Sequence, residues 1–439
     1  MSENRREFLK SVTAAGAAAI AGAPAILAQR SPNDTIGVAC IGVGTRGHQL
    51  LTEIQACPGT EVRLVCDLYD GHIARARKLN KNAKAVYTKD WEEALASKDV
   101  DVVTIATPDF WHAPIAIRAA ESKKDIYVEK GLCMDLKEAK AMRKAVRDNQ
   151  RVLQLGHHYN GMPVFHKARQ IWNSGELGKV PMIRMYIDRT GRFPEWQFYG
   201  WYATTELPKD ANEQTIDWQR FIRKASNRPF DAERFFRWRC WWEYGNGIAG
   251  DLMTHMWDSV NMVTGAGIPE TVMTMGNLYW WKQDREVPDQ WHVMMDYPKK
   301  ELAMTFGCTF ANTHVGEIVE YLGREKTMEV SPEFCRVYDG EWKQEYLEKK
   351  RPYERRQSEK IGLQRQDAVR LPDYSYKEGE LKVTDHMQDF VDCVRSRETP
   401  RCGMDRAFEE LAAVVLAVES YRKQRKVRWN AATEEVEVV

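Results

Sequence analysis

Paired cysteines, long hydrophobic runs and an excess of one charge sign are all missing from this sequence of 439 residues. The nine cysteines are odd in number and form no C-x-x-C pair, so neither a disulfide framework nor a structural zinc site is predicted. Lys and Arg total 64 against 63 Asp and Glu, and this balance gives no field that attracts nucleic acid or an anionic membrane. The expected partner is therefore a neutral small molecule, with no nucleic acid and no membrane anchor.

The first thirty residues carry a targeting pattern. Arg5 and Arg6 precede a mildly apolar stretch, rich in Ala and Gly, that reaches Ala28, and this is typical of a twin-arginine export signal. An amphipathic helix is the alternative, but two glycines and a proline interrupt the stretch. The apolar run is also too short and too weak to span a membrane. We expect residues 1–30 to be a signal peptide and the protein to be exported, already folded, to the periplasm or the medium.

The length predicts two or three domains. Residues 31–155 alternate short β-branched runs with helical stretches, which is typical of an α/β fold with a doubly wound parallel sheet, the Rossmann dinucleotide-binding type. The expected strands of this sheet are 36–41, 62–66, 102–106, 125–128 and 152–155.

Residues 156–439 have a different composition, with dense aromatic residues and longer strand-like runs. They predict an α+β domain with a mainly antiparallel, open sheet. The charged stretch 341–373 is expected on the surface, and two amphipathic helices are expected to close the fold. The expected strands and helices of this domain are 180–187, 272–281, 292–297, 302–310, 385–395 and 406–424.

A glycine loop joins the first expected strand to a helix. It comprises Gly42, Gly44, Thr45, Arg46 and Gly47. The first glycine allows a tight turn, the second lets the backbone approach a pyrophosphate, and the third packs the helix on the strand. Asp67 ends the second expected strand, where a carboxylate accepts ribose hydroxyls and repels a 2′-phosphate. The pattern predicts NAD rather than NADP; the alternative is a glycine turn in an unrelated α/β protein.

Two further motifs follow later strands, at the carboxyl edge where open α/β sheets bind ligands. Thr107 and Pro108 form a turn that leads to Trp111 and His112. Trp111 or His112 is expected to wall the nicotinamide pocket, and a structural loop residue is the alternative for His112. Glu129 and Lys130 close another strand. A lysine near a nicotinamide can hydrogen-bond the reacting oxygen and stabilise the alkoxide. The alternative for such a pair is a solvated strand end.

Asp251 and His255 lie four residues apart in a stretch expected to be helical. On one helix face the carboxylate can orient the imidazole, and an imidazole suits the removal of a hydroxyl proton. Metal binding is an alternative, with His157 and His158 as the only nearby candidates for a third ligand; no metal is predicted. A structural histidine is the other alternative.

With these motifs the chain resembles the glucose-fructose oxidoreductase and inositol dehydrogenase family (Gfo/Idh/MocA) over nearly all of its length after the export signal. The resemblance implies an N-terminal dinucleotide domain, a C-terminal sheet domain that often forms dimers or tetramers, and sugars or polyols as substrates. It also implies catalysis by Lys130, Asp251 and His255. The chain departs from the family at Gly131, where the family usually has proline, and a glycine leaves the position of Lys130 less constrained.

Aromatic residues gather at 196–202 and 235–242, and arginines are interleaved with the second cluster. Sugar faces stack on aromatic rings, and arginines bind hydroxyls or carboxylates, although core or subunit-interface positions are the alternative for each ring. The expected substrate residues are Tyr159, Asn160 and Trp238.

Three functions stay open. The preferred one is an NAD-dependent oxidoreductase that moves a hydride to or from a carbohydrate or glycoside. The second is a glycosidase or lyase that oxidises the sugar transiently and recycles its NAD. The third is a non-catalytic sugar-binding protein.

Overall fold

The computed structural model describes residues 35–197, 205–223, 227–340 and 372–439. The expected signal peptide and nearly all of the charged stretch 341–373 lie outside the described residues. Residues Ile36–Val439 form one compact unit. Within the described ranges, no helix is both long enough and apolar enough to cross a membrane.

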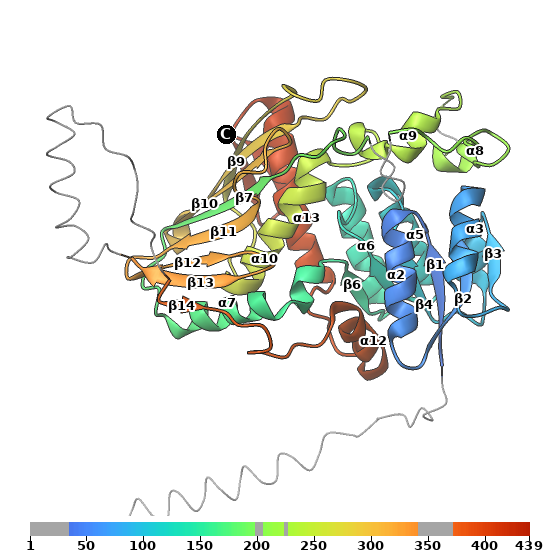
Figure 1. Cartoon of the computed structure of the whole chain (residues 1–439), viewed down its shortest axis with the longest axis horizontal. Coiled ribbons are helices and arrows are strands. Elements are labelled where there is room, and N and C mark those ends of the chain that lie inside the picture. The colour runs from blue at the N-terminus through green and yellow to red at the C-terminus, as the bar shows by residue number, and fades with distance from the viewer. Residues whose placement is uncertain (1–34, 198–204, 224–226, 341–371) are drawn as a thin grey trace, which may run out of the picture. The chain divides into compact units, whose positions relative to one another are not determined.

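A parallel six-stranded sheet forms the N-terminal part of this unit (Figure 1). Its strand order, β3-β2-β1-β4-β5-β6, is that of dinucleotide-binding folds and reverses between β1 and β4. The predicted doubly wound sheet is therefore confirmed. The strands are β1 (Ile36–Ile41), β2 (Thr60–Cys66), β3 (Val86–Thr88), β4 (Val102–Ile105), β5 (Asp125–Val128) and β6 (Leu153–Leu155).

Helices cover both faces of this sheet, so that β1, β4 and β5 are buried along their whole length. One face packs against α2 (Thr45–Ala56), α3 (Asp70–Leu79) and α12 (His386–Ser396). The other packs against α4 (Trp91–Ala96), α5 (Asp109–Glu121), α6 (Leu136–Asp148) and α13 (Met404–Lys423). The two C-terminal helices, α12 and α13, thus return to the N-terminal sheet.

A second sheet, with ten strands, is formed by the chain from β7 onward (Figure 1). All of its neighbouring strands are antiparallel except β7 and β10, which run parallel. This confirms the predicted, mainly antiparallel sheet. Its strands are β7 (Met182–Asp188), β8 (Thr271–Asn277), β9 (Gln290–Tyr297), β10 (Leu302–Thr309), β11 (Glu317–Leu322), β12 (Lys326–Val330), β13 (Cys335–Asp339), β14 (Tyr374–Ser375), β15 (Val427–Asn430) and β16 (Glu435–Val438).

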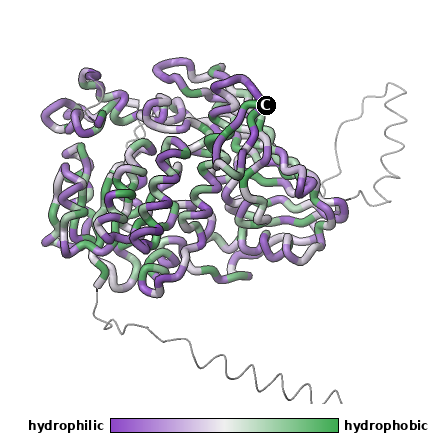
Figure 2. Tube along the Cα trace, turned by 180° about the vertical axis from the view of Figure 1, so that it is seen from behind, coloured by the Kyte–Doolittle hydropathy of each residue, from purple (hydrophilic) through white to green (hydrophobic). Residues whose placement is uncertain are grey.

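Helices cover one face of the ten-stranded sheet, and no helix of the described residues covers the other, open face. Helices α7 (Pro163–Ser174), α10 (Thr254–Thr264) and α13 pack against the covered face. Buried and exposed residues alternate along β9, as a half-covered strand requires. In Figure 2, hydrophilic residues are frequent in the outer loops of the chain.

Candidate active site

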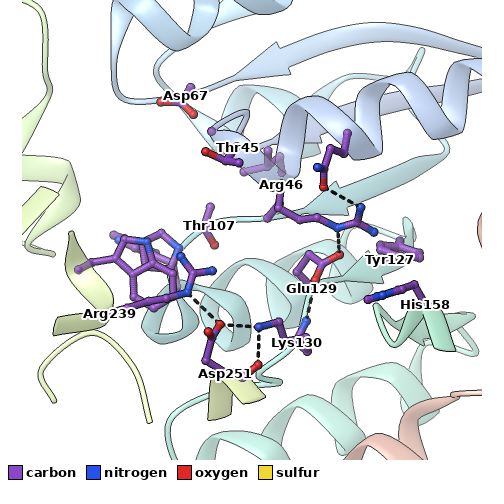
Figure 3. A pocket seen from close by; sticks show the side chains of 18 of the residues that line it. Thr45, Arg46, Asp67, Thr107, Tyr127, Glu129, Lys130, His158, Arg239 and Asp251 are labelled. Atoms are coloured by element: carbon purple, nitrogen blue, oxygen red, sulfur yellow. Dashed lines mark hydrogen bonds and ion pairs between the residues drawn. The ribbon is translucent and has the colours of Figure 1, made fainter. Parts of the chain in front are cut away.

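A cavity of about 800 Å³ lies at the carboxyl ends of β1, β4 and β5 (Figure 3). The glycine loop and Asp67 line one part of it, and Lys130, Asp251 and His255 line another. Residues far apart in the sequence therefore meet at the position where this type of sheet binds ligands.

The glycine loop has the geometry that a bound phosphate group requires. Gly42 has a φ of +79°, and a Cβ there would lie 2.7 Å from the backbone of Ala106. A Cβ on Gly47 would lie 1.9 Å from the carbonyl oxygen of Gly42, so only glycine lets α2 pack this closely on the loop. Helix α2 begins at Thr45, and within the described ranges no side chain caps it. Its first N–H groups are therefore free to bind an anion.

Asp67 follows β2 and lines the cavity. Its Oδ2 accepts the N–H of Val43 at 2.7 Å, and its Oδ1 accepts the N–H of Tyr69 at 2.9 Å. Burial opposes ionisation, but His72, 3.1 Å away, and the two backbone N–H groups lower the pKa of Asp67. A carboxylate has about four acceptor sites, so the ionised Asp67 can still accept ribose hydroxyls.

Arg46 and Glu129 connect the glycine loop to the end of β5 (Figure 3). Arg46 donates from Nε to Glu129 Oε1 at 2.7 Å and from Nη1 to Glu53 at 2.8 Å. Although burial opposes ionisation, Arg46 lowers the pKa of Glu129. Both side chains line the cavity as an ion pair, in the region where we expect the cofactor.

Thr107 and Pro108 line the cavity, whereas His112 does not. The Thr107 hydroxyl is buried and has no hydrogen-bond partner among the described residues, which fits a group that binds a ligand. His112 Nδ1 lies 2.7 Å from Gly131 O, and Nε2 lies 2.8 Å from Thr107 O. The structure therefore places His112 away from the cavity wall. Helix α5 turns His112 inward, where burial lowers its pKa, and Trp111 lines the cavity instead.

Lys130 lies directly after β5, and its side chain lines the cavity. Its Nζ donates to Asp251 Oδ1 at 2.5 Å and to the main-chain oxygen of Asp251 at 2.7 Å (Figure 3). The Lys130–Gly131 peptide bond is cis. The two hydrogen bonds to Asp251 hold Lys130 at the cavity, although Gly131 stands where the resemblance leads us to expect proline.

Asp251 receives three side-chain donors. Besides Lys130, Arg239 donates from Nε to Oδ1 at 3.0 Å, and Trp196 donates from Nε1 to Oδ2 at 2.9 Å. Burial opposes ionisation, but Lys130 and Arg239 hold the pKa of Asp251 far below its usual range. Asp251 is thus a fixed anion that orients Lys130.

The expected pairing of Asp251 with His255 is wrong. Asp251 lies in a π-helical turn, η3 (Ala249–Met253), whereas His255 lies in α10. The π-helical turn contains an extra residue, which shifts the i, i+4 relation of an ordinary helix. No hydrogen bond joins the two side chains, and both Asp251 oxygens face other donors.

His255 lines the cavity with one edge of its ring, while its Nδ1 is buried without a hydrogen-bond partner among the described residues. Burial and the nearby Lys130 lower the pKa of His255 well below its ordinary value. The ring is therefore neutral near pH 7 and able to accept a proton. His157 and His158 lie beside it, but the described residues include no group of three His, Cys, Asp or Glu side chains suited to a metal ion.

Two of the three expected substrate residues, Tyr159 and Trp238, line the cavity. Asn160 does not, because the short helix η1 (His158–Gly161) turns its side chain into the core. Asn160 is fully buried and donates from Nδ2 to Asp258 Oδ2 at 2.7 Å. The structure therefore places the Asn160 side chain in the core and not at the cavity wall.

Asp109, a residue that the sequence analysis did not single out, lies behind Lys130 and Asp251. It opens α5 and is only 5% exposed. Three glycines surround it, and a Cβ built on each would lie 3.0 to 3.6 Å from Asp109 Oδ2: Gly245, Gly250 and Gly131. Burial raises the pKa of Asp109 to about 7, against the effect of Arg239 and Lys130. Because these three glycines come from separate segments of the chain, no spacing pattern in the sequence indicates that they surround Asp109.

We expect Asp109→Asn to change the pH dependence of stability. Between about pH 4 and about pH 7 the native state keeps the Asp109 proton while the unfolded state has lost it. The native state then binds more protons, so stability falls as pH rises through this window. As the pH rises from about 4 to about 7, the free energy of unfolding of Asp109→Asn, measured in urea, should increase by a few kcal/mol relative to that of the wild type. Asp148→Asn, at an exposed ion pair, is the control. An Asp109→Asn difference that does not change with pH contradicts the assignment.

Two regions of the chain match one protein family. Residues 36–157 match the oxidoreductase family with an NAD-binding Rossmann fold. Residues 222–428 match the C-terminal alpha/beta domain of the same oxidoreductase family.

Curated relatives match over short segments. A levoglucosan dehydrogenase of Pseudarthrobacter phenanthrenivorans is 33% identical over 140 residues, which are 31% of this chain and 36% of that protein. A glycosyl hydrolase family 109 protein of Shewanella sp. (strain W3-18-1) is 37% identical over 112 residues, 24% of each chain. The matches thus span about a quarter to a third of these relatives.

Solved structures match over nearly the whole chain. A levoglucosan dehydrogenase in complex with NADH and levoglucosan has a TM-score of 0.62 at 19% identity, covering 90% of this chain and 99% of that one. The WlbA dehydrogenase from Bordetella pertussis, in complex with NADH and UDP-GlcNAcA, has a TM-score of 0.61 at 15% identity, with the same coverage. These likenesses show a shared fold. Together with the two matched regions, they show that the chain belongs to the Gfo/Idh/MocA oxidoreductase family.

Proposed function

We propose that the protein is an NAD-dependent oxidoreductase that moves a hydride between nicotinamide and a hydroxyl-bearing carbon of a carbohydrate or glycoside. The observation that carries this proposal is the shared cavity of Lys130 and His255, whose other part is lined by the glycine loop and Asp67. The free N–H groups of α2 and the unpartnered hydroxyl of Thr107 fit a dinucleotide.

The residues of the chain can perform the proton chemistry of this reaction. Bound NAD⁺ supplies the hydride acceptor. The Lys130 ammonium, oriented by Asp251, donates to the substrate oxygen and stabilises the negative charge that develops there. The neutral His255 takes the hydroxyl proton on its cavity side. Asp251 does not act as the base, because its pKa is held too low.

The cavity wall suits a sugar. Tyr159 and Trp238 offer aromatic rings, and the Arg239 guanidinium lies 4.2 Å from the ring centre of Trp238. Sugar faces stack on such rings, while a guanidinium binds hydroxyls. Two solved structures of the same fold hold a sugar, levoglucosan, and a nucleotide sugar, UDP-GlcNAcA.

A glycosidase that recycles its NAD is the second candidate. Its support is that several curated relatives carry the name glycosyl hydrolase family 109. Such an enzyme oxidises the sugar, releases the aglycone and reduces the ring again, so that no net reduction of NAD accumulates.

One experiment separates these functions. The purified protein is analysed by mass spectrometry for bound nucleotide and then mixed with sugars and glycosides while the absorbance of reduced nicotinamide is followed. Net reduction supports the dehydrogenase. Release of the aglycone without net reduction supports the glycosidase, and sugar binding with no cofactor and no reaction contradicts both.

We expect a preference for NAD over NADP, which Asp67→Ala narrows by about tenfold or more. The reason is that hydrogen bonds to a charged group contribute about 1.5–3 kcal/mol, and the ionised Asp67 also repels a 2′-phosphate. The dissociation constants of both cofactors, measured by fluorescence titration, test this. Asp70→Ala, at a half-exposed carboxylate nearby, is the matched control. Equal affinities in the unmodified protein remove the assigned role of Asp67.

We propose export through the twin-arginine route, with the protein periplasmic or secreted. The support is the sequence of residues 1–30, with Arg5 and Arg6 before the apolar stretch. Replacing both arginines with lysine is expected to leave the protein unprocessed in the cytoplasm, as cell fractionation and the mass of the N-terminus can show. Normal export of the double variant contradicts this proposal.

We also propose a homodimer or homotetramer formed through the open face of the ten-stranded sheet. Met273 of β8 is paired with Met294 of β9. Met273 is 45% exposed, and Met275 and Met294 are each 65% exposed. Adjacent exposed apolar side chains are typical of protein interfaces. Sedimentation velocity of the purified protein measures the oligomeric state directly.

A further inference from the structure

A buried polar cluster that the proposed mechanism does not use lies behind His255. His157 follows β6, Thr254 opens α10, and Glu410 lies in α13. The side chains of His157 and Glu410 are 1% and 0% exposed. The rings of His157 and His255 meet edge to face, with centroids 5.3 Å apart. The cluster thus begins at the expected base and leads away from the cavity.

Polar contacts continue inward from His157, while His255 meets His157 through the ring contact alone. His157 Nε2 lies 3.3 Å from the Thr254 hydroxyl and 3.7 Å from Glu410 Oε1. The Thr254 hydroxyl donates to Glu410 Oε1. The Nδ1 atoms of His157 and His255 are both buried and have no partner among the described residues. Leaving such an atom unpaired costs about 1–3 kcal/mol, so an accumulation of them beside a reacting group indicates a function for the cluster.

The charges around the cluster favour uptake of a proton. Burial works against a charged His157, but Asp258 and Glu410 raise the pKa of His157 on balance. Burial raises the pKa of Glu410, although His157 opposes this. The Asp258 carboxylate is itself held by Arg406 at 2.6 Å.

At the cavity end of the cluster, His255 binds a proton weakly, because Lys130 and two neighbouring histidines disfavour its charged form. Burial lowers the pKa of His255, and Lys130, His157 and His158 lower it further, against the weaker effect of Asp251. A proton on His255 therefore tends to move inward, to His157 and Glu410.

We propose that His157 and Glu410, bridged by Thr254, accept the proton that His255 removes from the substrate and store it away from solvent. This proposal rests on the proposed oxidoreductase function and adds an internal destination for the proton. His157 and Glu410 touch neither the substrate nor the cofactor; they act through His255.

The transfer balances in atoms and electrons. The C–H bond breaks with both electrons leaving as hydride to nicotinamide, while the hydroxyl proton moves to the cavity-side nitrogen of His255. The rings of His255 and His157 are in contact, and their Nδ1 atoms, which have no partner among the described residues, approach each other for the Nδ1 proton of His255 to pass to His157. His157 then donates its Nε2 proton to the Thr254 hydroxyl, which passes its own proton to Glu410 Oε1. The products are a carbonyl, a reduced nicotinamide and a protonated Glu410. Reversal of the same steps returns the proton, as a reaction that oxidises and then reduces the same sugar requires.

The coupling of the pair can be tested without any substrate. Histidine labelled with ¹⁵N reports the titration of each ring by NMR in the full chain, and His157→Gln assigns the His157 signal. Glu410→Gln removes the carboxylate, so the pKa of His157 is expected to fall. Glu409→Gln, on the neighbouring residue of α13 that bonds Asn261, is expected to leave it unchanged. If Glu410→Gln leaves the His157 titration as in the wild type, the store does not exist.

The stored proton can be counted during a single turnover. Protein loaded with NAD is mixed with levoglucosan in weak buffer, and reduced nicotinamide and a pH-indicator dye are followed together. The wild type is expected to reduce nicotinamide before any proton reaches the dye. Glu410→Gln is expected to reduce it about tenfold more slowly and to release one proton per nicotinamide. Prompt release of one proton per nicotinamide by the wild type overturns the proposal, and this count needs no variant to fold.

The two proposals fail in different ways. If neither levoglucosan nor any other sugar reduces the bound nicotinamide, the oxidoreductase function has failed. The NMR titration then still decides whether His157 and Glu410 share protons as proposed. If a sugar does reduce nicotinamide and the proton appears at once in solvent, only the store has failed.

Discussion

Replacing Lys130 with methionine is expected to lower kcat on the order of 10²- to 10⁴-fold while changing NAD binding little. Methionine fills similar space but cannot donate a hydrogen bond or offset charge on the substrate oxygen. The interaction strengthens as the alkoxide develops, so its loss should fall on kcat more than on KM. Stopped-flow reduction of bound nicotinamide, with NAD affinity measured separately, separates the two effects.

The matched control is Lys137→Met, at an exposed position of α6 near Lys130 in the sequence. It removes the same charge from the same part of the chain and is expected to keep wild-type turnover. If Lys130→Met also keeps wild-type turnover, Lys130 does not act on the substrate, and the non-catalytic sugar-binding function gains support.

Asp251→Asn is expected to have the second large effect, on both stability and turnover. The amide leaves Lys130 and Arg239 without their anion in a mostly buried site, and breaking a buried ion pair costs about 3 kcal/mol or more. Turnover should fall on the order of 10²-fold, because Lys130 loses the partner that orients it. Urea unfolding and steady-state kinetics measure the two losses.

The pH dependence of this loss has a definite sign. The pKa of Asp251 is lowered in the folded state, so the ion pair contributes its full stability above the unfolded value of about 4. The stability difference between the wild type and Asp251→Asn should therefore be constant near neutral pH and shrink in acid. Asp405→Asn, at an exposed ion pair, should cost less than about 1 kcal/mol. A similarly small cost for Asp251→Asn contradicts the assigned role.

The parts of the site that the sequence predicts are those that local spacing specifies. Gly42 and Gly47 follow a strand at fixed intervals, and each one meets backbone at a distance that excludes a side chain. Lys130 can be placed at the carboxyl edge because it directly follows a buried strand. The doubly wound sheet itself follows from the alternation of strands and helices.

The parts that the sequence did not predict depend on contacts between distant segments. The π-helical turn at Asp251 directs its carboxylate to Lys130 and Trp196 instead of His255. Asn160 directly follows Tyr159, which lines the cavity, but turns into the core to meet Asp258. No periodicity in one segment shows these orientations, because packing against other segments decides them.

Asp109 and Glu410 could not be predicted from the sequence for the same reason, since contacts between distant segments decide their burial. Each looks like an ordinary helix residue in the sequence, and both are buried only because other segments of the chain pack over them. A buried carboxyl with a raised pKa is the physical sign of interest at both positions, and that sign requires the folded structure.

The central claim is that this cavity brings a carbohydrate carbon into hydride contact with NAD. The most direct test is to incubate NAD-loaded protein with levoglucosan and other sugars and glycosides deuterated at carbon, and to analyse the bound nucleotide by mass spectrometry. When the reaction is quenched within the first turnover, before the nicotinamide is reoxidised, transfer of one deuterium to the nicotinamide from at least one sugar is the predicted result for a dehydrogenase and for a glycosidase that recycles NAD, and the transfer should be at least about 10²-fold slower in Lys130→Met. A nucleotide that stays free of deuterium with every sugar would contradict the account.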